Sequence, residues 1–162
     1  DGVGPDRPRR PDFAWRSVEP NTFGTDEFIP WCRSIGAEPM LAVNLGTGTA
    51  RDAAEYLEYV NLPRGTSIAD RRPVDAPYDV RLWCLGNEMD GPWQAGHVTA
   101  DEYGWRARQA GAIMKGLDGN VETVLCGSSG RDMPSYLEYD RVALEIAWDS
   151  VDYVSAHRYS AN

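Results

Sequence analysis

Four short apolar runs, each closed by small or polar residues, constrain the fold of this 162-residue chain more than any other feature. The runs span residues 39–48, 79–87, 121–130 and 151–159. Runs of this length and composition are typical of buried β-strands. Helical periodicity precedes the first run and separates the others, at residues 25–37, 49–62, 99–119 and 139–150. The sequence therefore predicts an α/β fold whose parallel strands are buried on both faces.

Start and stop signals support these helices. Thr25 and Thr99 are predicted N-caps, and Glu102, three residues after Thr99, would complete a capping box. Gly36 is predicted to end the first helix. Residues 63–79 are rich in Pro, Arg and Asp without periodicity, which predicts a long loop.

Two architectures fit this alternation, a doubly wound open sheet and part of a (β/α)₈ TIM barrel. No strand is followed by a dinucleotide or phosphate-loop motif, so no nucleotide cofactor is expected. Conspicuous polar residues follow the predicted strands, and in a barrel that rim carries the active site. They are Asn44, Asn87, Glu88, Ser128, His157 and Tyr159.

Charge and cysteine content narrow the classes of partner. The chain has 25 acidic and 16 basic residues, a balance that argues against nucleic acid as a partner. No apolar run is long enough to predict a membrane span. Cys32, Cys84 and Cys126 are interpreted as buried, reduced thiols, which favours a cytoplasmic location. His97 and His157 are too far apart to suggest a local metal motif, and both ends of the sequence are abrupt, so a fragment is expected.

The stretch WCLGNEMDGPWQAGH places an amide and a carboxylate directly after a predicted strand. Beside apolar Trp83 and Trp93, Glu88 would have a pKa raised by desolvation, which suits a general acid. Asn87 offers a donor and an acceptor to a sugar hydroxyl, and the faces of Trp15 and Trp93 suit sugar rings. These parts are typical of glycoside hydrolysis, where a second carboxylate acts with the acid.

Each residue also has a structural interpretation. Asn87 and Glu88 could be a helix N-cap and its first-turn acid, and His157 could be a structural histidine. Asp90 is interpreted as an Asx-turn residue. The stretch NLGTG, which begins at Asn44, could be a tight turn, and the tryptophans could serve packing alone. The gathering of these features on one predicted rim favours the functional interpretation.

The segment GNEMDGPWQ resembles the acid/base motif of glycoside hydrolase family 51, the α-L-arabinofuranosidases of the (β/α)₈ clan A. The stretches DGVGP, AWRSVEPNTFGTDEF, AEPMLAVNLGTGT, LWCLGNEMDGPWQ and VSAHRYSAN resemble the same family in the same order. The resemblance implies that residues 1–162 are a fragment of one catalytic barrel, from about its third to its sixth strand. The flanking strands and the family's C-terminal β-sandwich would lie outside the chain.

Residue by residue, the resemblance implies that Glu88 is the general acid/base and that Asn87 binds the sugar 2-hydroxyl. It implies that Trp15 lines the substrate pocket. It also implies that His157 and Tyr159 position the glycone and the nucleophile.

Asn44 and Trp93 lie in the matching motifs and are expected to neighbour the site. The family's nucleophile is a second glutamate at the end of the seventh strand, beyond this chain. Glu122 and Glu145 are predicted to face away from the rim, and Glu138 is placed in a loop.

The resemblance implies a cofactor-independent, retaining hydrolase that releases terminal α-L-arabinofuranosyl groups from arabinan, arabinoxylan or their oligosaccharides. The fragment alone is expected to be inactive. Family members are often hexamers, so the resemblance allows a homo-oligomer for the intact enzyme. Three alternatives stay open: another retaining glycosidase of the same clan, a non-catalytic carbohydrate-binding half-barrel, and an unrelated open α/β binding protein.

Overall fold

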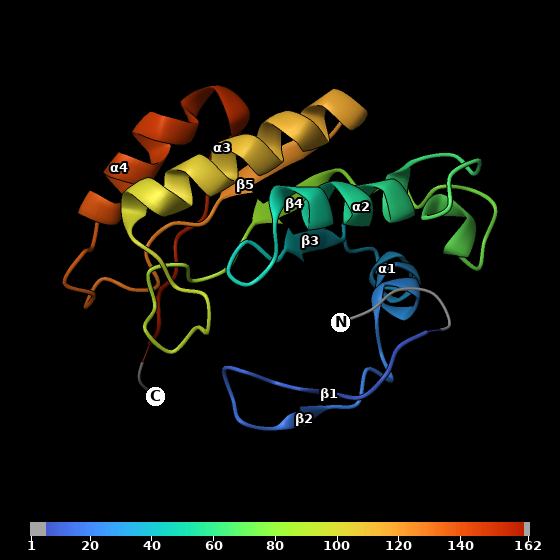
Figure 1. Ribbon diagram of the computed structural model, residues 1–162, viewed down its shortest axis with the longest axis horizontal. Coiled ribbons are helices and arrows are strands. Elements are labelled where there is room, and N and C mark those ends of the chain that lie inside the picture. The colour runs from blue at the N-terminus through green and yellow to red at the C-terminus, as the bar shows by residue number, and fades with distance from the viewer. Residues whose placement is uncertain (1–5, 161–162) are drawn as a thin grey trace.

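The computed structural model describes residues 6–160, which form a parallel sheet beneath a layer of helices (Figure 1). The sheet contains β3 (Met40–Val43), β4 (Leu82–Leu85), β5 (Glu122–Leu125) and β6 (Tyr153–Val154), side by side in chain order and all parallel. The helices are α1 (Thr25–Ser34), α2 (Ala50–Asn61), α3 (Ala100–Leu117) and α4 (Glu138–Ala147). The predicted α/β fold with a parallel sheet is confirmed.

Three helices, α2, α3 and α4, connect successive strands of the sheet and cover one of its faces (Figure 1). In Figure 1, α2, α3 and α4 lie on the same side of the strands, and α3 packs between α2 and α4. A doubly wound sheet would place helices on both faces and reverse the strand order at a switch point. The strand order seen here, β3-β4-β5-β6, has no such reversal. The four strands form an open sheet, so the closed barrel stays a prediction.

The core lies between the helices and the sheet. Leu41 and Trp83 are register partners whose side chains are buried there, and Val43, Leu85 and Leu125 form the next row. Parallel strands present alternate side chains to opposite faces, so these residues share the face that the helices cover.

The opposite face of the sheet is largely open, which contradicts the prediction of burial on both faces. Met40 is 51% exposed, Ala42 is exposed, and Leu82 and Cys84 are partly exposed. Within residues 6–160 no helix covers this face. Cys84 is therefore less buried than predicted, whereas Cys32 and Cys126 are buried, and all three thiols are free.

Two predicted caps differ from the structure. Gly24, not Thr25, is the N-cap of α1, and the Glu27 carboxylate accepts a hydrogen bond from its N–H. Thr25 is buried instead, with its hydroxyl 2.8 Å from that of Tyr56. Thr99 does cap α3, but the Glu102 carboxylate pairs with an arginine one turn on, so the box lacks its reciprocal bond.

Two segments depart from the predicted elements. A short antiparallel hairpin of β1 (Arg10–Pro11) and β2 (Val18–Glu19) precedes α1 and was not predicted. The strand expected over residues 151–159 pairs only at Tyr153 and Val154, which bind β5. The rest of that segment runs on past the sheet toward the end of β4.

The loop predicted over residues 63–79 contains a short 3₁₀ helix, η1 (Ala69–Arg71). A second 3₁₀ helix, η2 (Trp148–Ser150), follows α4. Arg72 anchors the loop over residues 63–79: its guanidinium is buried and donates to the carbonyl groups of Tyr59 and Leu62 at 2.6 and 3.1 Å. None of the helices within residues 6–160 is long and apolar enough to cross a membrane.

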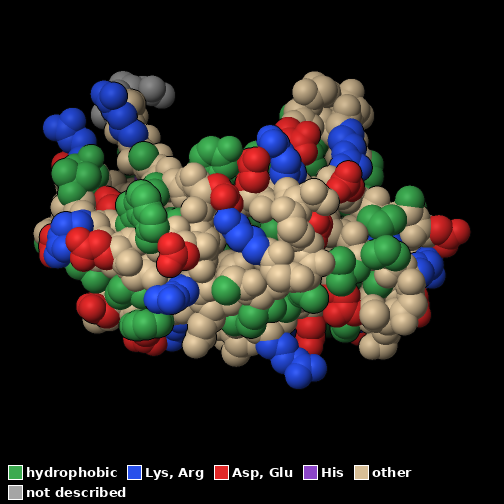
Figure 2. Space-filling view, turned by 90° about the horizontal axis from the view of Figure 1, so that it is seen from above, with side chains coloured by type: hydrophobic (Ala, Val, Ile, Leu, Met, Phe, Trp, Pro, Cys, Tyr) green, Lys and Arg blue, Asp and Glu red, His purple; other side chains and the backbone are tan. Residues whose placement is uncertain are grey.

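Acidic and basic side chains are interspersed over the helix-covered side (Figure 2). Ion pairs one turn apart account for part of this pattern, with Arg51 bound to Glu55 and Arg141 bound to Glu145. Such exposed pairs contribute little to stability. The face therefore has a mixed charge pattern.

Candidate active site

A buried carboxylate, that of Glu88, lies just beyond the end of β4 and meets the chain that follows β6. Its side chain is 10% exposed. Oε1 accepts a 2.6 Å hydrogen bond from the Tyr159 hydroxyl and lies 3.0 Å from Nδ1 of His157. Oε2 accepts a 2.8 Å hydrogen bond from the Trp93 indole. Residues about seventy positions apart in sequence thus converge on one carboxylate.

The backbone at Glu88 has an unusual conformation. Its φ is +47°, a left-handed value that costs a residue with a side chain about 1–2 kcal/mol. Gly86 has a φ of +98°, and a Cβ there would lie 2.9 Å from the Met89 sulfur. The Glu88 carbonyl accepts from the N–H of Gly91 at 2.9 Å, which closes the turn. Strain of this kind persists where the surroundings hold it, and it clusters at functional sites.

The pKa of Glu88 is lowered, contrary to the prediction from sequence. Burial acts to raise this pKa, but the hydrogen bonds from Tyr159, His157 and Trp93 stabilise the ionised form and outweigh burial. Trp83 does not flank Glu88: it is fully buried on the helix side of the sheet and donates to the Val80 carbonyl. Glu88 is therefore an ionised carboxylate at neutral pH in this chain.

The structure brings four of the seven predicted site residues together. The four are Glu88, Trp93, His157 and Tyr159. Trp93, expected only to neighbour the site, contacts Glu88 directly.

The other three predicted site residues are exposed. The Asn87 side chain faces solvent and makes no hydrogen bond within residues 6–160. Asn44 is engaged in its own turn, where Oδ1 accepts from the N–H groups of Gly46 and Thr47. Trp15 lies in the β1–β2 turn and is 71% exposed, and its backbone N–H donates to the Asp12 carboxylate.

Contacts between neighbouring rim loops were missed from the sequence. Asp90 does not form the predicted Asx turn: its carboxylate accepts from the N–H and the hydroxyl of Ser129, in the loop after β5. The hydroxyl of buried Tyr103 joins the same two strands, since it donates to the Leu85 carbonyl at 2.7 Å and accepts from the Cys126 N–H at 2.6 Å. The position of Asp90 and Ser129 at adjacent strand ends was the only sequence signal of their contact.

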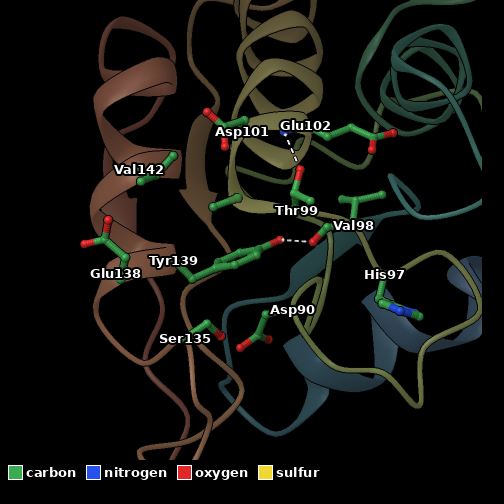
Figure 3. Close-up of a pocket in the computed structure, with 11 residues that line it drawn as sticks. Asp90, His97, Val98, Thr99, Asp101, Glu102, Ser135, Glu138, Tyr139 and Val142 are labelled. Atoms are coloured by element: carbon green, nitrogen blue, oxygen red, sulfur yellow. Dashed lines mark hydrogen bonds between the residues drawn. The ribbon is translucent and has the colours of Figure 1, made fainter.

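A pocket of about 690 Å³ opens beside the loop after β4, between the N-terminal ends of α3 and α4 (Figure 3). Tyr139 crosses it toward the Val98 carbonyl, and Asp90 lies at its side (Figure 3). Glu88 is not among its lining residues. Within the described residues, no group of three or more His, Cys, Asp or Glu is arranged to hold a metal ion.

The other glutamates considered from sequence are held elsewhere. Glu122, at the opposite end of β5, accepts from Arg81 and from the Tyr153 hydroxyl. Glu138 and Glu145 both pair with Arg141 on the exposed side of α4. No second carboxylate within residues 6–160 contacts Glu88.

A buried carboxylate at the carboxyl end of a parallel strand, surrounded by hydrogen-bond donors, is an arrangement typical of glycoside hydrolases. The whole chain, residues 1–162, matches the family model described as the alpha-L-arabinofuranosidase 1 domain. The chain belongs to this family, the α-L-arabinofuranosidases of glycoside hydrolase family 51.

Individual relatives agree with this assignment. The chain is 51% identical over 167 residues to an intracellular exo-α-(1→5)-L-arabinofuranosidase of Acetivibrio thermocellus, covering 100% of this chain and 33% of that protein. It is 47% identical over 165 residues to an exo-α-(1→6)-L-arabinofuranosidase of Bifidobacterium longum, covering 98% of this chain and 32% of that protein. A solved family 51 α-L-arabinofuranosidase from Bifidobacterium longum superposes with a TM-score of 0.90 at 42% identity, covering 96% of this chain and 32% of that one. The chain therefore spans about a third of the length of these relatives.

Proposed function

We propose that this chain supplies the acid/base half of a retaining α-L-arabinofuranosidase, with Glu88 as the proton donor and acceptor. The observation that carries the proposal is the convergence of Trp93, His157 and Tyr159 on the Glu88 carboxylate. We further propose that the four parallel strands are an arc of a (β/α)₈ barrel and that residues 1–162 are a fragment of that one domain. In such a barrel the carboxyl ends of all strands, including those outside this chain, face one site.

In the proposed reaction, Glu88 first protonates the oxygen of the leaving group. It then removes a proton from the water that opens the glycosyl–enzyme intermediate. The nucleophile is a second carboxylate from outside this chain, about 5 Å from Glu88 in a retaining enzyme. Its negative charge would raise the pKa of Glu88, because two neighbouring carboxylates disfavour a second ionisation. In the complete site, the second carboxylate would thus raise the pKa of Glu88 from the lowered value that it has in this chain alone.

The donors around Glu88 have distinct proposed roles. Tyr159 and His157 hold the carboxylate in place and also border the space where the sugar would bind. The Asn87 amide makes no hydrogen bond to the residues that the structure describes, which suits a contact with the sugar 2-hydroxyl. Trp15 offers an exposed ring to the substrate from the β1–β2 turn, and Asn44 shapes the neighbouring turn.

The proposed substrates are oligosaccharides or polysaccharides with terminal α-L-arabinofuranosyl groups, such as arabinan and arabinoxylan. The names of the relatives cover both (1→5) and (1→6) linkages, so the proposal includes no linkage preference. A relative is named as an intracellular enzyme, which supports an intracellular location for this protein as well.

A chimera tests the proposed function. This chain replaces the matching segment of the Acetivibrio thermocellus relative, and hydrolysis of arabino-oligosaccharides is measured. We expect Glu88→Gln to lower kcat/KM by about 100- to 10,000-fold, the range that a general acid contributes. The matched control is Glu122→Gln, at the opposite end of the sheet, which should leave kcat/KM within about twofold since surface changes of this kind are near neutral. An active Glu88→Gln chimera would refute the proposal.

The absence of a second carboxylate beside Glu88 in the described residues gives one alternative, a carbohydrate-binding module without chemistry. The same chimera decides between the two. Arabinose binding that survives Glu88→Gln, together with a chimera that never hydrolyses the substrate, would favour the binding module.

A further inference from the structure

The carboxylate of Asp90 joins the loop that carries Glu88 to the loop after β5. Its two oxygens lie 3.1 and 3.2 Å from the backbone nitrogen of Ser129, and the Ser129 hydroxyl also donates to it. Ser129 is 2% exposed. A carboxylate that binds a backbone N–H and a hydroxyl together is a strong, directional anchor. The two residues are 39 positions apart, so this contact fixes one loop against another.

The anchor lies next to the strained backbone of Glu88. Met89 is 3% exposed, and its carbonyl accepts from the N–H of Val98 at 3.0 Å. Asp90 follows directly and is fixed by Ser129. The backbone on the C-terminal side of Glu88 is thus held at two successive residues, while Glu88 itself keeps a φ of +47°.

The segment that carries the donors His157 and Tyr159 is bound to the end of β5. The N–H of Ser155 donates to the Leu125 carbonyl at 2.9 Å, and the Ser155 hydroxyl accepts from the N–H of Gly127 at 3.3 Å. These bonds lie just before His157 and Tyr159. The end of β5 and the loop after it therefore bind both partners of the Glu88 contact. Ser129 binds the loop that carries Glu88. Leu125 and Gly127 bind the segment that carries His157 and Tyr159.

We propose that Asp90, bound through Ser129, is a positioning residue that places the Glu88 carboxylate within reach of His157 and Tyr159. The positioning itself follows from the contacts above. Its effect on hydrolysis rests on the proposed function, so the experiment has one arm that needs activity and one that does not.

The first arm measures the pKa of Glu88 in the 162-residue chain by carboxyl ¹³C NMR titration. Asp90→Asn has two opposite effects on this pKa. Loss of a nearby negative charge lowers it, whereas release of the Glu88 carboxylate from its donors raises it. If Asp90 positions Glu88, the second effect dominates, and we expect the pKa of Glu88 to rise, since each donor that is lost destabilises the ionised form.

Ser129→Ala keeps the charge of Asp90 and removes one donor, so it should shift the pKa of Glu88 in the same direction by less. It decides the outcome if Asp90→Asn does not fold. The matched control is Asp101→Asn, which removes an exposed carboxylate from the same pocket wall without touching the loop after β5. A pKa of Glu88 that falls or stays constant in Asp90→Asn and in Ser129→Ala would overturn the proposal.

The second arm uses the chimera and compares leaving groups. A good aryl leaving group departs without protonation, whereas a sugar leaving group needs the acid. We expect Asp90→Asn to lower kcat/KM by about 10- to 100-fold on arabino-oligosaccharides and by less than about threefold on an activated aryl arabinofuranoside. Equal losses on both would mean that Asp90 only stabilises the fold. If no chimera hydrolyses either substrate, the proposed function fails, and the titration still decides the role of Asp90.

Discussion

The loops after β3 and β4 have similar sequences, since each places an asparagine and glycines directly after a buried strand, but the structure uses them differently. Asn44 finds its partners within its own turn: Oδ1 accepts from Gly46 and Thr47, and Nδ2 donates to the Thr47 hydroxyl at 2.8 Å. Glu88, in the second loop, finds His157 and Tyr159 in a segment that follows a different strand.

The contrast separates a turn from a candidate site. An exposed side chain that bonds to the next few backbone N–H groups stabilises the local chain and needs nothing else. A buried carboxylate is costly unless several donors surround it, and a left-handed φ adds to that cost. The loop after β4 has both costs, a buried carboxylate and a left-handed φ at Glu88, and the hydrogen bonds from His157 and Tyr159 offset them. Such an arrangement indicates a requirement on the position of that carboxylate.

The largest effect is expected from the chain tested by itself. The loop after β4 supplies one carboxylate and none of the described residues supplies another beside it. We therefore expect the purified 162-residue chain to hydrolyse an aryl α-L-arabinofuranoside at least about 10,000-fold more slowly than the chimera, because groups that act as a unit fail together. Release of the phenol is the measurement. Comparable turnover would show that a carboxylate of this chain is the nucleophile, and the site after β4 would then be complete.

Gly96 is where the two compared loops touch. A Cβ on Gly96 would lie 2.2 Å from the carbonyl carbon and 2.4 Å from the Cα of Gly46, both backbone atoms that cannot rotate away. We expect Gly96→Ala to lower the free energy of unfolding by about 1–3 kcal/mol, as overpacking does. Urea denaturation of the chain measures it.

Gly119→Ala is the matched control for Gly96→Ala. Apart from its chain neighbours, no atom of residues 6–160 lies within 4 Å of a Cβ built there, and its φ is not in the left-handed range. It should be neutral or slightly stabilising, by about 0.4–1 kcal/mol. Equal stability of the two variants would mean that the two loops do not rest on each other.

Much of this architecture could be predicted because it depends on local patterns. Periodicity located every helix of the layer, and short apolar runs located the four strands of the parallel sheet. Parallel strands have their carboxyl ends at the same edge of the sheet. Because Glu88 and His157 each follow a strand, their placement at one rim could be predicted. The Thr99 cap followed from local chemistry as well.

The features that escaped prediction depend on contacts between loops. The partner of Asp90 and the contact of Trp93 with Glu88 require the path of the loop in three dimensions. The direction of the Glu88 pKa shift depends on a balance between burial and three donors, and sequence indicated only the burial. The open face of the sheet, with Met40 exposed, depends on what lies beside the strands and not on their own pattern.

Removal of the Tyr159 hydroxyl tests the long-range half of the comparison. Its 2.6 Å bond stabilises the ionised form of Glu88, so we expect Tyr159→Phe to raise the pKa of Glu88 toward its ordinary value. Because the folded-state pKa lies below the unfolded one, ionised Glu88 stabilises the fold above about pH 4.5, and this contribution is lost as the pH falls through the folded pKa.

Tyr159→Phe should therefore be less stable than the parent chain at neutral pH, by about 1.5 kcal/mol if the bond is typical of hydrogen bonds to charged groups, and the difference should vanish in acid. Carboxyl NMR titration and urea denaturation at several pH values measure the two effects. Tyr153→Phe is the matched control, because its hydroxyl binds Glu122 at the other end of the sheet. If both variants shift the pKa of Glu88 equally, the bond from Tyr159 is not the cause.

The smallest effect is expected at Asn44, and it tests the local half of the comparison. Asn44→Ala removes three bonds of an exposed turn, so we expect a loss of about 1 kcal/mol in the free energy of unfolding. Asn44→Asp keeps the acceptor for the N–H groups of Gly46 and Thr47 and should retain about half of that stability. In both variants the pKa of Glu88 should stay constant, and kcat/KM of the chimera should change by less than about threefold. A large loss of activity at unchanged stability would instead place Asn44 against the substrate, and the two loops would then serve the same purpose.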